Sequence, residues 1–225
     1  MPSISRSQEE ARSRSQDLIR SAGHGIGRAM IRTPWLWPLL RAPVRRFFDL
    51  RADSWDRRTV ESDPEFLLPL ATALTQVDEP ERALDLGTGT GVAALLIARE
   101  FPRCSVRGVD ISEPMIKRAT RRIGLDPDGR VAFRVADASS LPFADDSFDL
   151  VTQLNLPPFL AETARVLRPG GFFIVATSWG ERTPFHVSPL KLERAARRYG
   201  LEPVTSGRSG QGQYSVFTPA LHPPD

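Results

Sequence analysis

The chain of 225 residues contains little cysteine, lysine, histidine or long apolar sequence. The single cysteine, Cys104, excludes an internal disulfide, and its place before a predicted strand favours a structural thiol over a nucleophile. Three histidines and one cysteine form no cluster that suits a metal, so we expect none. The longest apolar run, 92–98, is far shorter than the ~20 residues of a membrane-spanning helix. The N-terminus lacks the apolar core of a signal peptide, so we expect a cytoplasmic protein.

The basic charge is concentrated near the N-terminus. Residues 1–58 contain twelve arginines and six acidic residues, a net charge of +6, whereas residues 59–225 have a net charge of −3. A basic, aromatic segment can pack on the rest of the protein, contact a membrane surface or bind nucleic acid. We rank these in that order, with a transient membrane contact assigned to residues 35–48, because acids are interspersed and prolines interrupt a long amphipathic helix.

The sequence divides into an N-terminal helical extension at 1–79, a body at 80–219 and a tail at 220–225. Three glycines are expected to interrupt the polar helix that begins the extension: Gly23, Gly25 and Gly27. Three prolines limit the aromatic stretch that follows to short helical pieces: Pro34, Pro38 and Pro43. A last helix is predicted over 65–75.

Strands and helices alternate through the body. The predicted strands are 83–86, 105–110, 131–135, 148–154, 172–177, 201–206 and 214–218. The predicted helices are 92–100, 113–123, 159–167 and 189–199. Turns are predicted at 169–171 and, within a final hairpin, at 207–212. This order predicts an α/β fold with a Rossmann-like, doubly wound, seven-stranded sheet, mostly parallel with one antiparallel strand from the C-terminal hairpin.

A glycine-rich turn follows the first predicted strand, in the segment Leu84-Asp-Leu-Gly-Thr-Gly-Thr-Gly91. Glycines at this place let the backbone turn tightly and approach a nucleotide-like ligand. A dinucleotide-binding fingerprint would have Gly or Ala at position 92, where this chain has Val92. Asp85 lies on the strand, where a carboxylate suits an ammonium group better than a pyrophosphate. The segment therefore favours a cofactor that carries an amino acid over NAD.

Acidic residues follow the next two strands. Asp110 ends the second strand about 20 residues after the glycine turn, the spacing at which a carboxylate accepts hydrogen bonds from ribose hydroxyls. A lone acid at a strand end is often only solvent-facing, but this one coincides with the glycine turn. Asp137 is placed to contact the edge of a purine. Asp145 and Asp146 precede the fourth strand, so they are expected to be surface turn residues at the opposite edge of the sheet.

Five stretches occur in a recognisable order over roughly residues 80–180. They are Leu84–Gly91, Gly108-Val-Asp-Ile-Ser-Glu-Pro-Met115, Asp137-Ala-Ser-Ser-Leu-Pro-Phe143, Asp146-Ser-Phe-Asp-Leu-Val151 and Ala164-Arg-Val-Leu-Arg-Pro-Gly-Gly171. Together they resemble the class I S-adenosylmethionine-dependent methyltransferases, close to the type 11 branch that includes ubiquinone/menaquinone-type C-methyltransferases. The segment 48–56 resembles, more weakly, the F-D-x-x-A-x-x-Y/W-D element often found upstream in that family.

The resemblance implies S-adenosyl-L-methionine as cofactor and S-adenosyl-L-homocysteine as product. It assigns the methionine end of the cofactor to Asp85, Gly87, Thr88, Gly89 and Gly91. It assigns the ribose to Asp110, the adenine face to Ile111, and the adenine edge to Asp137 and Ala138. Leu154 and Asn155, at the end of the fourth strand, would face the methyl group.

The implied activity is methyl transfer to a small-molecule acceptor by in-line displacement. The alternatives are a methyltransferase for RNA or protein that uses the arginine-rich arm, and a cofactor-binding protein without turnover. A general base is needed only where the acceptor must lose a proton. His186, which follows the fifth strand, is the first candidate for that catalytic role, ahead of His24 and His222.

The chain lacks the helix that the family often inserts after the fourth strand. It continues directly through Asn155-Leu-Pro-Pro-Phe159, where Leu156 also breaks the spacing of the N-P-P-Y/F motif of amino-group methyltransferases. Another part of the chain must therefore cover the acceptor. The aromatic residues from Trp35 to Trp55 predict an N-terminal lid.

Overall fold

The computed structural model describes residues 6–124, 126 and 128–220, so His222 and most of the predicted tail lie outside the described residues. The strands are β1 (Arg82–Leu86), β2 (Ser105–Asp110), β3 (Val131–Val135), β4 (Phe148–Leu154), β5 (Leu167–Thr177), β6 (Leu201–Ser209) and β7 (Gly212–Pro219). The α-helices are α1 (Arg6–Arg32), α2 (Trp37–Asp49), α3 (Trp55–Arg58), α4 (Leu68–Leu74), α5 (Val92–Glu100), α6 (Glu113–Ile123), α7 (Leu160–Val166) and α8 (Pro189–Arg197). Short 3-10 turns are η1 (Pro34–Leu36), η2 (Ala52–Ser54) and η3 (Gly180–Arg182).

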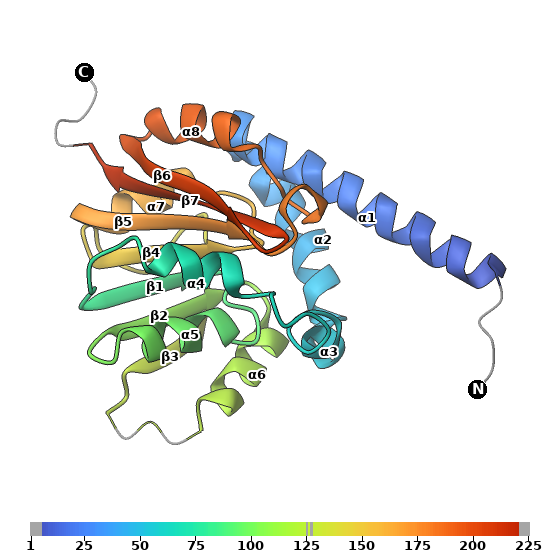
Figure 1. Ribbon diagram of the computed structural model, residues 1–225, viewed down its shortest axis with the longest axis horizontal. Coiled ribbons are helices and arrows are strands. Elements are labelled where there is room, and N and C mark those ends of the chain that lie inside the picture. The colour runs from blue at the N-terminus through green and yellow to red at the C-terminus, as the bar shows by residue number, and fades with distance from the viewer. Residues whose placement is uncertain (1–5, 125, 127, 221–225) are drawn as a thin grey trace.

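The seven strands form one sheet in the order β3-β2-β1-β4-β5-β7-β6 (Figure 1). The pairs from β3 to β5 are parallel, and β7 runs antiparallel to both of its neighbours, β5 and β6. The predicted fold class, with one antiparallel strand supplied by the C-terminal hairpin, is confirmed. The division of the chain at residues 79 and 80 stays a prediction.

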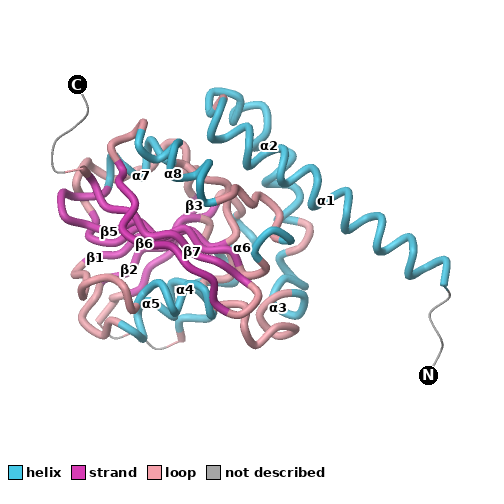
Figure 2. Tube along the Cα trace, turned by 45° about the horizontal axis from the view of Figure 1, so that its top comes forward, coloured by secondary structure: helices cyan, strands magenta, loops and turns pink. Residues whose placement is uncertain are grey.

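Helices cover both faces of the sheet (Figure 2). On one face, α4 and α5 pack on a core that includes Leu70, Ile97 and Leu150. On the other, α7 and α8 pack on a core around Phe148 and Phe173. The central strands β1 and β4 are buried along almost their whole length, as parallel strands covered on both faces are, and they also bury the polar side chains of Asp85, Thr152 and Gln153.

Most elements of the body lie where the sequence predicts them, and α5, α6, β2, β3 and β4 have the predicted bounds. Strand β5 begins at Leu167 and includes the predicted turn at 169–171, because Leu167 pairs with Phe148 before an irregularity in the register. In the last hairpin the predicted turn at 207–212 shrinks to two residues. Ser209 pairs with Gly212, and Gly210 has a φ of 54°, which suits the first position of a two-residue hairpin turn.

The prediction that three glycines interrupt the first helix is wrong, because α1 continues to Arg32. Two of these glycines, four residues apart on one helix face, let α1 approach the loop that follows η3. A Cβ at Gly23 would lie 2.9 Å from Cβ of Pro184, and a Cβ at Gly27 would lie 2.5 Å from the carbonyl oxygen of Phe185. Tertiary packing therefore offsets the low helix propensity of glycine here.

The extension differs from its prediction at two further places. Helix α2 continues through Pro43 for thirteen residues, although prolines were expected to limit this region to short pieces. Pro43 is exposed, so the carbonyl group that its missing N–H leaves unpaired can be hydrated. The helix predicted over 65–75 is shorter, since α4 begins at Leu68 with Pro69 in its first turn. In the described part of the chain, no helix is both long and apolar enough to cross a membrane.

The glycine contacts of α1 make a direct test possible. Gly27→Ala is expected to lower the free energy of unfolding by about 1–3 kcal/mol, because the added methyl group meets the backbone of Phe185. The matched control is Gly25→Ala, where a Cβ meets nothing within 4 Å; it is expected to be neutral or to stabilise by about 0.5–1 kcal/mol. Urea unfolding measures both, and equal stability of the two variants would contradict the packing of α1.

Candidate functional site

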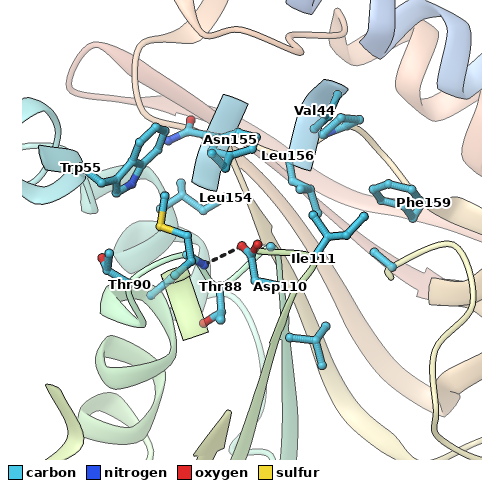
Figure 3. A pocket seen from close by; sticks show the side chains of 18 of the residues that line it. Val44, Trp55, Thr88, Thr90, Asp110, Ile111, Leu154, Asn155, Leu156 and Phe159 are labelled. Carbon is cyan, nitrogen blue, oxygen red and sulfur yellow. Dashed lines mark hydrogen bonds between the residues drawn. The ribbon is translucent and has the colours of Figure 1, made fainter. Parts of the chain in front are cut away.

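A cavity lies at the C-terminal edge of β1, β2 and β4, under α2 (Figure 3). Parallel strands that diverge on either side of β1 leave a crevice at this edge, which is where ligands bind in sheets of this kind. Its walls are the glycine turn, the ends of β2 and β4, and aromatic residues from the extension. The residues that face it from the extension and α4 region are Trp37, Val44, Phe48, Trp55 and Phe66.

The glycine turn forms the floor of the cavity. Gly87, Gly89 and Gly91 have φ values of 66°, 54° and 85°, which side chains with a Cβ rarely adopt. A Cβ at Gly89 would find nothing closer than 4.0 Å, so the turn leaves open space on its cavity side. Gly91, by contrast, is buried, and a Cβ there would lie 2.8 Å from Phe133. Gly91 therefore serves the packing of the turn, whereas Gly87 and Gly89 line the cavity.

Asp110 lines the cavity beside the turn and holds its shape. Its carboxylate accepts hydrogen bonds from the backbone N–H of Gly89 at 3.0 Å and of Ser112 at 2.8 Å. Burial raises the pKa of Asp110 to about 6, against the lowering effect of these two hydrogen bonds. Ile111 and Ala138 also line the cavity, and their predicted contacts with adenine stay predictions.

Asp85 lies behind the turn and does not line the cavity. Its side chain is 1% exposed; Oδ1 accepts a hydrogen bond from Thr152 at 2.8 Å, and Oδ2 has no partner among the described residues. Burial raises the pKa of Asp85 to about 6. Thr88 likewise has a buried hydroxyl without a partner in the described structure. A contact between Asp85 and a ligand stays a prediction; Thr88, unlike Asp85, lines the cavity.

Asp137 contacts residues of the lid and does not line the cavity. Nε1 of Trp37 donates a hydrogen bond to Oδ1 of Asp137 at 2.8 Å, and the guanidinium group of Arg41 lies 3.6 Å from Oδ2. The ring of Trp37 meets Phe159 edge to face, with centroids 5.0 Å apart. Trp37 of α2 is thus in contact both with the residue that follows β3 by two positions and with the residue directly before α7. The predicted contact of Asp137 with adenine stays a prediction.

The segment 48–56, which matches the upstream element of the family, joins the lid to the glycine turn. Asp49 accepts a hydrogen bond from Oγ of Ser112 at 2.6 Å. Asp56 is 7% exposed; it accepts a hydrogen bond from Thr90 at 2.6 Å and pairs closely with Arg122. The aromatic members of the segment, Phe48 and Trp55, face the cavity while the acids hold it in place. Sequence reasoning singled out this segment without finding the roles of Asp49 and Asp56.

The end of β4 forms the wall opposite the glycine turn. Asn155 has a φ of 56° and exchanges two hydrogen bonds of 2.8 Å with Ser178, so its amide is held by the protein. Leu156 packs on the turn itself, since a Cβ at Gly87 would lie 2.5 Å from its Cδ1. Leu154, Asn155 and Leu156 all line the cavity (Figure 3).

His186, the predicted general base, does not line this cavity. Its Nδ1 is 3.2 Å from Nε2 of Gln213, and its ring centroid is 6.0 Å from that of His24. Burial, and then the charge of His24, lower the pKa of His186. His24 itself contacts the carbonyl oxygen of Thr183. The catalytic assignment of His186 stays a prediction, and the two rings lie where α1 meets the loop after η3.

The remaining candidates lie away from the cavity. Cys104 is fully buried, and burial raises the pKa of its thiol to about 11, which suits a structural role. Asp145 is exposed and pairs with Arg165, and Asp146 has a φ of 53° in the turn before β4. Within the described residues, no group of three acidic, histidine or cysteine side chains is arranged to hold a metal.

Burial of Asp85 predicts a dependence of stability on pH. Its folded pKa of about 6 lies above the value of roughly 3.9 in an unfolded chain. The folded state therefore keeps a proton that the unfolded state loses, so the free energy of unfolding falls as pH rises from about 4 to 6, by roughly 2–3 kcal/mol. Urea unfolding of the ligand-free protein measures this. Asp110, whose pKa burial also raises to about 6, adds a fall of the same sign over this range. Asp85→Asn should therefore remove only the Asp85 part of the slope, while Asp145→Asn leaves the slope unchanged; a slope indifferent to Asp85→Asn would contradict the assignment.

The hydrogen bond from Trp37 to Asp137 predicts how firmly the lid is held. Trp37→Phe keeps an aromatic ring against Phe159 but removes a hydrogen bond to a charged group, worth about 1.5–3 kcal/mol. We expect amide hydrogen exchange in α2 to become roughly tenfold faster or more. The matched control is Trp35→Phe, since Trp35 is 73% exposed. Equal protection of α2 in both variants would show that this hydrogen bond does not hold the lid.

Comparison with known proteins supports one family. Residues 83–171 match the family model described as a methyltransferase domain. The ubiquinone/menaquinone biosynthesis C-methyltransferase UbiE of Desulfotalea psychrophila is 42% identical over 100 residues, which are 40% of this chain and 38% of that protein. The malonyl-[acyl-carrier protein] O-methyltransferase of Geobacter sulfurreducens is 33% identical over 174 residues, 74% of this chain and 62% of that protein. This chain therefore covers less than two thirds of either relative.

A solved structure has the same fold. The methyltransferase crystallised in complex with the Trm112 activator of Haloferax volcanii matches with a TM-score of 0.63 and 24% identity, over 77% of this chain and 97% of that one. The resemblance found in the sequence is confirmed by the family model and these relatives: residues 83–171 form a methyltransferase domain, similar to that of the ubiquinone/menaquinone C-methyltransferases.

Proposed function

We propose that this protein transfers a methyl group from S-adenosyl-L-methionine to a small, largely apolar acceptor. The proposal rests on one observation: a single cavity has a polar end and an apolar end. At one end lie the glycine turn and Asp110, which suit a nucleoside with an attached amino acid. At the other end lie aromatic and aliphatic side chains of the lid and of the loop after β4.

The residues present fit the cofactor. The open space above Gly89 admits a ligand against the backbone, and the unpaired oxygens of Asp85 and Thr88 lie directly behind the turn. Asp110 would accept hydrogen bonds from the ribose, and Ile111 and Ala138 would enclose the adenine. Asp137 would act at the adenine end by holding Trp37 in place.

When bound, S-adenosyl-L-methionine supplies a methyl group on a sulfonium, which a nucleophile takes by in-line displacement. The chain itself contributes orientation, which can supply ~7 kcal/mol or more of a bimolecular barrier. Leu154 and Leu156 fix one wall, and Phe48 and Trp55 close the opposite side against water. The hydrogen bonds between Asn155 and Ser178 keep the wall from shifting.

The lining of the cavity also restricts the acceptor. Asp110 is the one titratable side chain among the described lining residues, and it is engaged at the ribose end. An acceptor in the apolar end would therefore be ionised already, or would release its proton to solvent. Relatives named for quinone biosynthesis and for O-methylation of malonyl-[acyl-carrier protein] are compatible with small acceptors of these kinds.

Binding and turnover can be tested separately. Asp110→Asn is expected to weaken S-adenosyl-L-methionine binding at least roughly tenfold, because it removes a charged hydrogen-bond acceptor; calorimetry measures this, with Asp145→Asn as the control. Urea unfolding of the ligand-free variants shows whether weaker binding results from a lost contact with the cofactor or from a less stable fold.

Transfer of labelled methyl groups is then followed with quinols, phenols, carboxylic acids, RNA and protein. Transfer to RNA or protein alone would overturn the small acceptor, and absence of cofactor binding would overturn the whole proposal.

A further inference from the structure

Helix α2 is apolar on two faces. Its inner face presents Trp37, Val44 and Phe48 to the cavity. Large exposed side chains lie on its outer face and directly before and after it: Trp35 in η1 is 73% exposed, Leu39 in α2 74%, and Leu50 after α2 72%. Most large hydrophobic side chains of a soluble domain are at least partly covered, so three on one short segment form an unusual surface.

These exposed side chains lie on one stripe. Positions 35, 39, 42, 46 and 50 are separated by three or four residues, the spacing at which side chains share a helix face. The stripe therefore consists of Trp35, Leu39, Ala42, Arg46 and Leu50, and we call it the outer stripe. Pro38 and Pro43 are exposed at its margins and add apolar surface.

The surroundings of the outer stripe are basic. Residues 28–51 contain six arginines and a single acidic residue, a net charge of +5. The acid, Asp49, bonds to Ser112 on the inner side, so it does not offset the charge at the stripe. Arg45 and Arg46 are both exposed. A long arginine side chain can lie along apolar material while its guanidinium group meets phosphate.

We propose that the outer stripe docks this protein on an anionic lipid surface. Tryptophan and leucine side chains would enter the region between headgroups and acyl chains, and the arginines would contact lipid phosphates. Charge favours this occupant over a second copy of the chain, because two copies that meet through the outer stripe would bring their arginines together. Docking would place α2, the helix that covers the cavity, at the membrane, where apolar acceptors dissolve.

The test measures sedimentation of the whole chain with vesicles, so it does not depend on methyl transfer. Binding is expected to vesicles of phosphatidylcholine with phosphatidylglycerol, to be weaker for phosphatidylcholine alone, and to fall with added salt. Arg45→Glu with Arg46→Glu should weaken binding at least roughly tenfold, since each arginine near such a surface contributes about 1 kcal/mol. Trp35→Ser with Leu39→Ser should abolish the binding that remains in high salt.

Matched variants elsewhere on the surface serve as controls. Leu190→Ser removes a leucine that is 69% exposed on α8, and Arg99→Glu with Arg103→Glu reverses two exposed charges on the far side of the sheet. These controls should bind vesicles as the unchanged protein does. Equal losses in the controls, or no sedimentation with anionic vesicles, would overturn the proposal. So would light scattering that shows a dimer which Leu39→Ser converts to a monomer.

Discussion

The site depends on the parallel pairing of β1 with β2 on one side and with β4 on the other. Because these strands point the same way, their C-terminal ends meet at one edge of the sheet, while the connections that leave them diverge. Leu84 and Leu86 pack into the core on one face and Ala83 into the core on the other, so a shift of β1 would unpack both. The glycine turn, Asp110 and Leu154 are positioned by this edge.

The lid is held by polar contacts from residues that lie far apart in the sequence. Asp56 binds Thr90 and Arg122 beneath the segment that carries Trp55, and Asp49 binds Ser112 at the start of α6. Burying charged or polar groups lowers the stability of the fold unless each group has a hydrogen-bond or ion-pair partner. Their result is that the aromatic residues of the extension face the cavity in one arrangement rather than several. After β4 the chain continues directly to α7, and the extension supplies side chains to the cavity at this place.

The sequence was sufficient for the body of the fold because its signals there are local. The bounds of β2 and α6 follow from the spacing of apolar residues and from the turn residues beside them. The glycine turn is recognisable from its three glycines alone. The course of α1 was predicted wrongly because the reason for Gly23 and Gly27 is the loop at 184–185, more than 150 residues away. Packing against a segment that is distant in the sequence cannot be predicted from the residues next to these glycines.

The same limit applies to the site. Asp110 could be predicted from its distance to the glycine turn, since both lie in one β-α-β unit. The pairing of Asp137 with Trp37 could not, because the two residues are 100 positions apart and each has an ordinary local explanation. Likewise the position of Asp85 on β1 predicts a ligand contact, which stays a prediction, but its burial beside Thr152 follows only from the pairing of β1 with β4.

Asp137 belongs to the end of β3 and at the same time to the closed position of α2. A ligand that orders the end of β3 therefore also favours the closed lid, and the closed lid must favour that ligand by the same factor, because coupling free energies are reciprocal. If Asp137 contacts a bound ligand, as the sequence predicts, closure of α2 and occupancy of this end of the cavity are coupled through its carboxylate. A substitution at Arg41, which reaches Asp137 from α2, would then change the affinity for a ligand that Arg41 itself does not contact.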